Sequence, residues 1–186
     1  MRIGLLGGSF NPPHQGHIHA SKVALKRLHL DYVWWLVSPQ NPLKAKRGMA
    51  NFKNRLEAAR ALAQHPRIVV TGIEGELKTR FTIDTLRALK RRFPKARFVW
   101  LMGSDNLLQL PRWKKWQDIF RLVPIAVVAR TGSALAARLS PAAARFRAAE
   151  RPADASFAAI KPPAFTILDA KRDPTTATSL RVSSPK

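Results

Sequence analysis

Short apolar runs alternate along the chain with segments in which apolar residues recur at the spacing of one helix face. The runs predict strands and the spaced segments predict amphipathic helices. Because the runs are apolar throughout, they are typical of strands that are covered on both faces. The predicted strands are Ile3–Gly7, Tyr32–Val37, Ile68–Thr71, Phe98–Met102 and Ile125–Val128, and the predicted helices are Gly16–His29, Asn51–Gln64, Thr82–Phe93 and a segment around Trp113–Leu122.

The alternation of strands and helices predicts an α/β fold with a mostly parallel sheet. Beyond Arg130 the pattern is weaker. The segment Ser133–Arg151, rich in Ala and Arg, predicts one or two flanking helices, and Phe165–Leu168 predicts a last short strand. A chain of 186 residues suits one α/β domain and would be cramped for two, so we expect residues 1–186 to form a single domain.

Polar segments begin where three of the predicted strands end. They are Gly7–His17, Ser38–Lys44 and Gly103–Asp105. Parallel sheets bind ligands beyond the carboxyl ends of their strands. We therefore expect these segments to meet at one edge of the sheet and to form the functional site.

The segment Gly7–His17 carries the most specific chemistry, with the sequence Gly-Gly-Ser-Phe-Asn-Pro-Pro-His-Gln-Gly-His. Its glycines let backbone N–H groups approach an anion, and the start of the following helix favours phosphate. His14 and His17 would stand beside that phosphate, and an imidazole can be protonated near neutral pH. The segment lacks the glycine spacing of a dinucleotide fingerprint and the Lys-Ser/Thr ending of a P-loop.

Composition excludes several classes of protein. The chain has no cysteine, so it can form neither disulfides nor cysteine metal sites. No apolar run approaches membrane-spanning length and no signal pattern precedes the first strand, so we expect a cytoplasmic protein without a membrane partner. The formal charge of +22 would attract nucleotides or nucleic acid, but the basic residues are spread along the chain. We therefore expect a basic surface rather than a dedicated nucleic-acid site.

The stretch Gly-Ser-Phe-Asn-Pro-Pro-His-x-Gly-His resembles the nucleotidyltransferases whose hallmark is His/Thr-x-Gly-His. The resemblance implies a Rossmann-like nucleotidyltransferase fold, with a mostly parallel sheet and helices on both faces. It also implies adenylyl transfer, in which a phosphate oxygen of the acceptor attacks the α-phosphorus of ATP in line and pyrophosphate leaves. His14 and His17 would bind the α and β phosphates and stabilise the transition state, so that positioning and electrostatics supply the rate. The other ATP-binding residues that it implies in this segment are Gly8, Ser9, Phe10 and Gly16.

Two further segments are similar to the bacterial nicotinate mononucleotide adenylyltransferases. Asn-Pro-Leu-Lys, ending at Lys44, implies that this lysine contacts substrate phosphate. Phe-Thr-Ile-Asp-Thr-Leu, beginning at Phe81, implies that Thr82 helps recognise the nicotinate carboxylate, although Phe81 stands where Tyr is usual. The same residues also predict an ordinary helix start, with Thr82 as N-cap and Asp84 in the first turn.

A third similar segment, Gly-Ser-Asp-Asn-Leu, contains Asp105 and is followed by Trp113. The resemblance implies that Asp105 serves nucleotide or ribose binding and that Trp113 stacks on the nicotinate ring. Tryptophan suits this role because a cationic pyridinium is attracted to its face. Trp116, three residues further on, is expected to pack at the domain edge.

The fourth similar segment lies near the end of the chain, where Thr-Ala-Thr-Ser-Leu-Arg resembles a family signature that holds the ATP phosphates. It implies phosphate binding by Thr178 and Arg181, with Arg181 neutralising charge on the departing pyrophosphate. Ala177 replaces a serine of that signature. The family usually continues with a further helical segment, so we expect an abbreviated C-terminal part.

Together these segments imply that ATP and nicotinate mononucleotide react to deamido-NAD and pyrophosphate, a step of NAD biosynthesis. Mg²⁺ would be held mainly by ATP phosphate oxygens and water, because the motifs offer no carboxylate cage. Two alternatives stay open. A pantetheine-phosphate adenylyltransferase would more often carry Thr at the position of His14, and a non-catalytic basic nucleic-acid-binding module on this fold would not need the histidine pair. The sequence leaves the oligomeric state undetermined.

Overall fold

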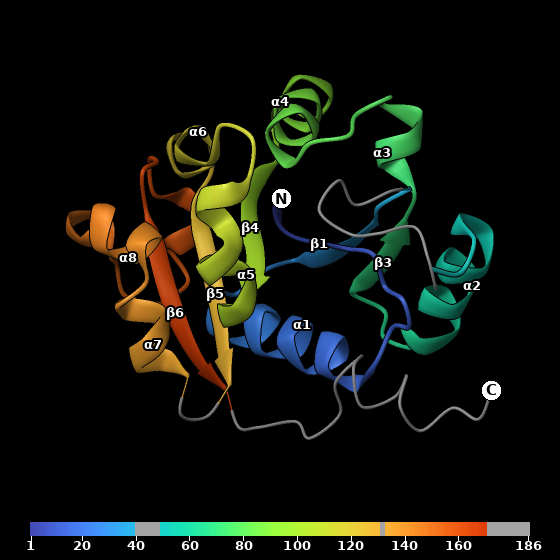
Figure 1. Cartoon of the computed structure of the whole chain (residues 1–186), viewed down its shortest axis with the longest axis horizontal. Coiled ribbons are helices and arrows are strands. Elements are labelled where there is room, and N and C mark those ends of the chain that lie inside the picture. Colours follow the sequence, from blue (N-terminus) through green and yellow to red (C-terminus); the bar gives the residue numbers. More distant parts are fainter. Residues whose placement is uncertain (40–48, 131–132, 171–186) are drawn as a thin grey trace.

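A computed structural model describes residues 1–39, 49–130 and 133–170 (Figure 1). Its centre is a sheet of six parallel strands in the order β3-β2-β1-β4-β5-β6. The predicted α/β class is therefore confirmed, and the sheet is parallel throughout. The strands are β1 (Arg2–Gly8), β2 (Tyr32–Val37), β3 (Ile68–Thr71), β4 (Arg97–Gly103), β5 (Ile125–Arg130) and β6 (Phe165–Ala170).

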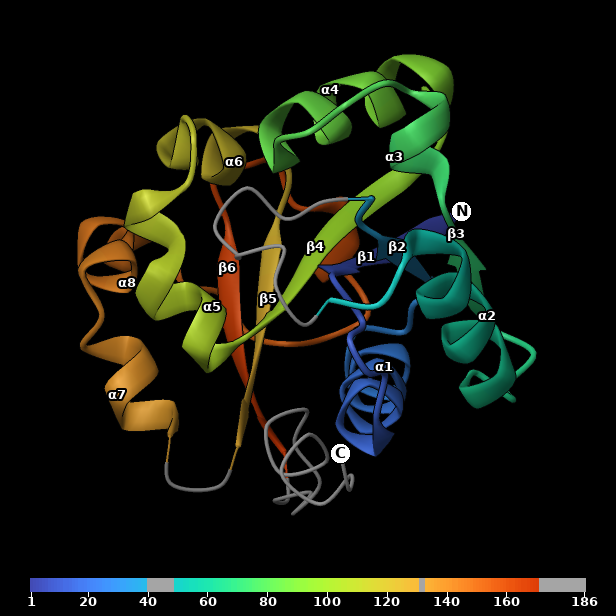
Figure 2. The same cartoon turned by 45° about the vertical axis from the view of Figure 1, so that its right-hand side comes forward.

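Helices cover both faces of the sheet (Figures 1 and 2). The larger α-helices are α1 (Gln15–Arg27), α2 (Phe52–Leu62), α4 (Thr82–Arg92) and α6 (Trp116–Leu122), and the shorter ones are α3 (Ile73–Glu76), α5 (Ser104–Gln109), α7 (Ala134–Arg138) and α8 (Pro141–Arg145). Short 3-10 turns lie at Leu110–Arg112, Arg147–Ala149 and Phe157–Ala159. One core cluster joins α1 and α2 to the sheet, and the other joins α4 to α8 to the opposite face.

All six strands run in the same direction, so their carboxyl ends lie at one edge of the sheet. Gly8 pairs with Val37 of β2, and Gly103 pairs with Val128 of β5. The chain turns to opposite sides of the sheet after β1 and β4, which are neighbours. A ligand crevice forms at such a reversal of strand order.

The helix boundaries differ from the predictions in places that have local causes. The helix expected around Trp113 begins only at Trp116, because a 3-10 turn precedes it and Lys115 adopts a left-handed φ of 50°. The prediction of Thr82 as N-cap is wrong. Phe81 occupies that position without a side-chain cap, and Thr82 is the first helical residue. The helices α3 and α5 were not predicted, because segments of 4 and 6 residues are too short to show a helical period.

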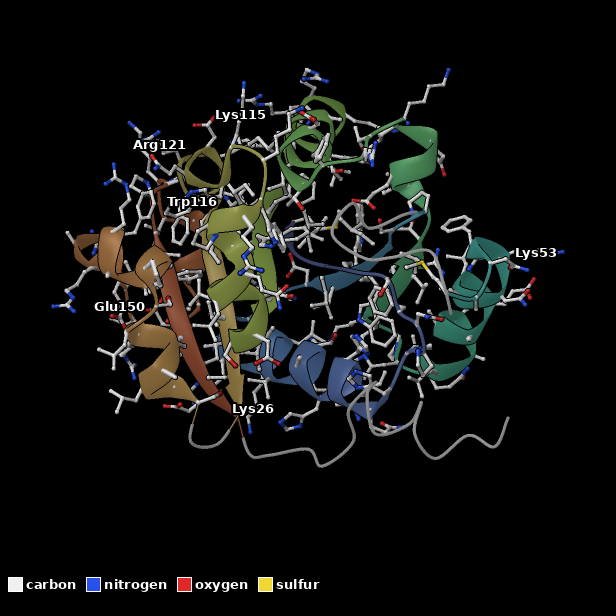
Figure 3. All side chains as sticks on the ribbon, viewed as in Figure 1. Lys26, Lys53, Lys115, Trp116, Arg121 and Glu150 are labelled. Atoms are coloured by element: carbon white, nitrogen blue, oxygen red, sulfur yellow. The ribbon has the colours of Figure 1, made fainter. Side chains whose placement is uncertain are left out.

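Basic side chains are dispersed over the described surface. Figure 3 labels Lys26 of α1 at the bottom of the view, Lys53 of α2 at the right, and Lys115 and Arg121 in the region of α6 at the upper left. No helix among the described residues is long and apolar enough to cross a membrane.

Gly7 lets the core close at the end of β1. A Cβ at Gly7 would lie 2.5 Å from Cη2 of Trp100, whereas a Cβ at Gly103 would meet no atom within 4 Å. We expect Gly7→Ala to lower the free energy of unfolding by about 1–3 kcal/mol through overpacking. Urea unfolding checks this, with Gly103→Ala as the control at the equivalent end of β4. Equal stabilities of the two variants would show that the Trp100 ring moves aside at no cost.

Candidate active site at the carboxyl edge of the sheet

His14 and His17 cap the first helix reciprocally. His14 is the extended N-cap of α1, and its Nδ1 accepts a hydrogen bond from Gly16 N at 3.1 Å. The main-chain N–H of His14 donates to Nδ1 of His17, also at 3.1 Å. The two imidazole centroids are 3.9 Å apart. The arrangement is a capping box in which two imidazoles replace the usual hydroxyl and carboxylate.

This cap determines which hydrogen-bonding atoms the imidazoles can offer. Since each Nδ1 accepts from a backbone N–H, the proton of each neutral ring is on Nε2. Both rings are then Nε2–H donors at the N-terminus of a helix whose first turn contains no acidic residue. No carboxylate of the first turn therefore neutralises the partial positive charge of the helix start.

The loop before the histidines is supported from within the core. Phe10 is 2% exposed, and its ring lies 4.7 Å from His17 and 5.0 Å from Trp35, centroid to centroid. Trp35 Nε1 donates to Ser21 Oγ, which donates in turn to the main-chain oxygen of His17. The structure thus places the Phe10 side chain behind His17, so any contact of Phe10 with a phosphate would come from its main chain.

Arg55, which the sequence reasoning missed, lies buried beside the same loop. It is 2% exposed, and its guanidinium donates to Ser9 O, Ser38 O and Pro39 O at 2.6, 2.9 and 3.0 Å. Its Nε donates to Ala50 O at 2.9 Å. Burial lowers the pKa of Arg55 from its ordinary value. Local sequence gives no signal for this role, since Arg55 is one of 33 basic residues.

Glu74 is a second buried charge that the sequence reasoning missed. The residue is 8% exposed, and its carboxylate accepts hydrogen bonds from the hydroxyls of Thr85 and Ser38. Thr79 and Thr85 share a further hydrogen bond of 2.9 Å between their hydroxyls. Burial raises the pKa of Glu74 to about 6, although the two hydrogen bonds partly oppose the rise.

Two of the residues predicted to bind the mononucleotide, Thr82 and Trp113, lie on connected elements. Lys114 Nζ is 3.1 Å from Asp84 Oδ2 and 4.4 Å from the centroid of the Phe81 ring, which ties the start of α4 to the turn carrying Trp113. Trp113 is half-buried and meets Trp100 edge to face, with ring centroids 6.4 Å apart. Because Trp100 also lies against Gly7, the Trp100 ring alone separates Trp113 from the end of β1.

The remaining predicted residues fall into two groups. Asp105 is exposed in the first turn of α5, directly beyond β4. Lys44, Thr178 and Arg181 lie outside the described residues.

The prediction for Trp116 is confirmed, because its ring packs against Phe120 and Phe146 at the edge of the domain. Among the described residues, no group of three or more His, Cys, Asp or Glu side chains could hold a metal ion.

The strand order and the histidine-capped helix at its reversal define a nucleotide-binding α/β protein. Residues 5–182 match the model of the cytidylyltransferase-like family. A protein of Parvibaculum lavamentivorans is 55% identical over 97% of this chain and 91% of its own length, and one of Cereibacter sphaeroides is 54% identical over 98% of both. Both are named "Probable nicotinate-nucleotide adenylyltransferase". The chain belongs to the nicotinate-nucleotide adenylyltransferase family, as predicted.

Solved structures agree on the fold. Plasmodium falciparum nicotinic acid mononucleotide adenylyltransferase complexed with NaAD superposes with a TM-score of 0.72 at 14% identity, covering 97% of this chain and 82% of that one. The same enzyme complexed with APC gives 0.69 with the same coverage. The predicted nucleotidyltransferase fold is therefore confirmed.

The raised pKa of Glu74 makes stability depend on pH. The pKa is about 6 in the folded protein and 4.5 ordinarily, so between these values the folded state binds more protons than the unfolded state. The resulting stabilisation is complete below pH 4.5 and is lost as the pH rises through 6. A pKa difference of this size corresponds to about 2 kcal/mol.

We therefore expect Glu74→Gln to gain stability relative to the wild type as the pH rises across this window, by about 2 kcal/mol. Urea unfolding at a series of pH values measures the difference. Glu76→Gln, an exposed residue of the same turn, is the matched control and should show no such trend. A pH-independent difference for Glu74→Gln would mean that Glu74 does not titrate in this range.

Proposed function

We propose that this chain transfers the adenylyl group of ATP to nicotinate mononucleotide, giving deamido-NAD and pyrophosphate in NAD biosynthesis. The observation that carries the proposal is the His14–His17 cap at the start of α1, which lies at the strand-order reversal. The family to which the chain belongs supports the reaction class and the substrate pair. Its relatives at 50–55% identity give no support to a pantetheine-phosphate adenylyltransferase or to a non-catalytic module.

The histidine loop suits in-line displacement at phosphorus. Nε2–H groups of His14 and His17 donate to oxygens of the α and β phosphates, where negative charge increases as pyrophosphate departs. The α1 N-terminus and the main chain of Gly8, Ser9, Phe10 and Gly16 add to this electrostatic stabilisation. The imidazoles are already oriented by the cap, so little reorganisation accompanies the reaction. Thr178 and Arg181 bind the same phosphates, and Arg181 neutralises the leaving pyrophosphate.

The mononucleotide occupies the opposite part of the edge. Trp113 stacks on its pyridinium ring, Thr82 binds the carboxylate, Asp105 accepts hydrogen bonds from ribose, and Lys44 contacts its phosphate. The edge-to-face contact with Trp100 and the Lys114–Asp84 ion pair support this arrangement, because they tie Trp113 to the start of α4.

Adenylyl transfer from ATP generally uses a divalent metal ion, and we infer that it is Mg²⁺ here. The ion would be held by phosphate oxygens and water, which suits a cation that retains its hydration. We also infer that residues 1–186 form one domain, which is supported by the single sheet that contains all described strands. Because its reaction consumes ATP, we place the enzyme in the cytoplasm.

The activity is tested by pyrophosphate release from ATP and Mg²⁺, with nicotinate mononucleotide, nicotinamide mononucleotide or phosphopantetheine as acceptor. We expect release with nicotinate mononucleotide. Release with phosphopantetheine alone would favour the alternative enzyme. Salt-sensitive RNA binding without release from any acceptor would favour the nucleic-acid-binding module.

A variant can separate the capping role of His14 from its chemistry. Asn is a good N-cap residue, so His14→Asn retains the bond from Gly16 N while removing the Nε2–H donor. We expect unchanged thermal stability and a turnover about 10²–10⁴-fold lower. His29→Asn is the matched control, because His29 is exposed at the far end of α1 and its left-handed φ of 46° tolerates Asn. Turnover of His14→Asn within a few-fold of the control would remove His14 from the mechanism.

Stacking by Trp113 has its own signature. We expect Trp113→Ala to raise KM for the mononucleotide about tenfold, the equivalent of one aromatic stacking interaction, while KM for ATP changes little. Trp113→Phe should recover most of the loss. Steady-state kinetics in both substrates measure the effect, with Trp116→Phe as the control in the same turn. An unchanged KM for the mononucleotide in Trp113→Ala would exclude the stacking role.

A further inference from the structure

The buried guanidinium of Arg55 connects the loop after β1 to the loop after β2. Gly8 and Val37 are the last paired residues of β1 and β2, and Ser38 N still donates to Gly8 O at 2.9 Å. The two carbonyls that follow, of Ser9 and Ser38, both accept from Nη1 of Arg55. Beyond the last paired residues of β1 and β2, Arg55 therefore connects the two chain segments in place of the hydrogen bonds between the strands.

The same side chain also holds the segments on either side of residues 40–48. Its Nη2 donates to Pro39 O at 3.0 Å, and its Nε donates to Ala50 O at 2.9 Å. Ala50 N donates in addition to Asn11 Oδ1 at 3.2 Å, which ties Ala50 to the histidine loop. Four of the five guanidinium N–H groups thus end on main-chain carbonyls of two loops, the one after β1 and the two ends of the one between β2 and α2.

The network continues from Ser38 toward α4. The Ser38 hydroxyl hydrogen-bonds to Glu74, and Glu74 accepts from Thr85 in the first turn of α4. The histidine loop and the helix that begins at Thr82 are therefore joined through the partly buried Ser38 and the buried side chains of Arg55, Glu74 and Thr85. Such groups are costly to bury, and fully satisfied networks of this kind fix the relative position of the segments that they join.

None of the ion pairs among the described residues includes Arg55. Its charge strengthens the bonds to the carbonyls instead, and only a planar group with several fixed donors can make all of them. Lysine has one nitrogen and cannot reach the carbonyls on both sides of the guanidinium. The geometry is thus specific to arginine rather than to positive charge.

We propose that Arg55 is a positioning residue for adenylyl transfer: it holds the loop carrying Ser9 against Ser38 and Pro39. The loop proposed to bind ATP then keeps a fixed distance from the start of the segment that leads to Lys44, which is proposed to bind the mononucleotide. It acts through the backbone of these loops and touches neither substrate. This inference rests on the proposed function for its kinetic consequences, whereas its structural consequence is independent of it.

The kinetic test uses Arg55→Lys in the full chain, with Arg60→Lys as the matched control, because Arg60 is exposed on the same helix. We expect Arg55→Lys to raise KM for both substrates and to lower kcat/KM about 10–100-fold, as small misplacements of binding groups do. A purely stabilising role would lower the melting temperature and the active fraction but leave both KM values unchanged. That outcome would overturn the proposal.

Chemical rescue provides a second kinetic readout. Arg55→Ala removes the guanidinium and leaves a space of its shape, so millimolar guanidinium ion should recover part of the lost kcat/KM. The same concentration of sodium chloride should recover none. If neither ion restores activity to folded Arg55→Ala, and Arg55→Lys retains both wild-type KM values, the positioning role is excluded.

Hydrogen exchange tests the proposal without activity. In Arg55→Lys, we expect faster amide exchange in the peptides covering 8–11 and 38–39, while the interior of β4 stays protected as in the wild type. Unchanged exchange in those peptides would overturn the proposal even if the enzyme is slower. If the wild type itself releases no pyrophosphate, the proposed function fails, but the exchange result still decides whether Arg55 holds these loops.

Discussion

The ring of Trp100 lies against the backbone of β1 at Gly7, and the geometry of the site depends on this contact. Since Gly7 has no side chain, the core closes over the end of the central strand and leaves the chain free to turn into the histidine loop. The same ring meets Trp113 edge to face. One aromatic side chain of the core therefore contacts both the start of the loop proposed to bind phosphate and the residue proposed to stack on the substrate.

The histidine pair makes helix capping compatible with the proposed phosphate binding. An ordinary capping box places a glutamate or glutamine in the first turn, and a carboxylate there would repel a phosphate. In this chain, His14 and His17 satisfy the backbone N–H groups with neutral ring nitrogens. The helix start thus carries no carboxylate that would repel an anion.

Both buried charges at this edge meet at Ser38. Its carbonyl accepts from Arg55, and its hydroxyl hydrogen-bonds to Glu74. Desolvation opposes the charge of each, as the lowered pKa of Arg55 and the raised pKa of Glu74 indicate. A protein core gains little stability from such groups, whereas a site that must hold several loops in place gains defined geometry.

The sequence by itself determined the order of strands and helices and the chemistry of the first loop. Continuous apolar runs, helical spacing and the motif ending in His17 are local patterns, so they can be recognised without knowledge of contacts. Tyr32–Val37 and Ile68–Thr71 were predicted with the bounds that the structure has. The resemblance also predicted the family correctly, because its motifs keep their order along the chain.

Only the tertiary structure decided which polar residues support the site. Arg55 bonds to Ser9 across 46 positions of the chain, and Thr85 bonds to Glu74 across 11, where no periodicity connects the partners. Phe10 shows the same limit, because its motif gave no sign that its ring would pack against Trp35 and His17 in the core. Local sequence specifies the elements and the reactive groups. The parallel sheet brings distant loops to one edge, and burial there determines which side chains hold them.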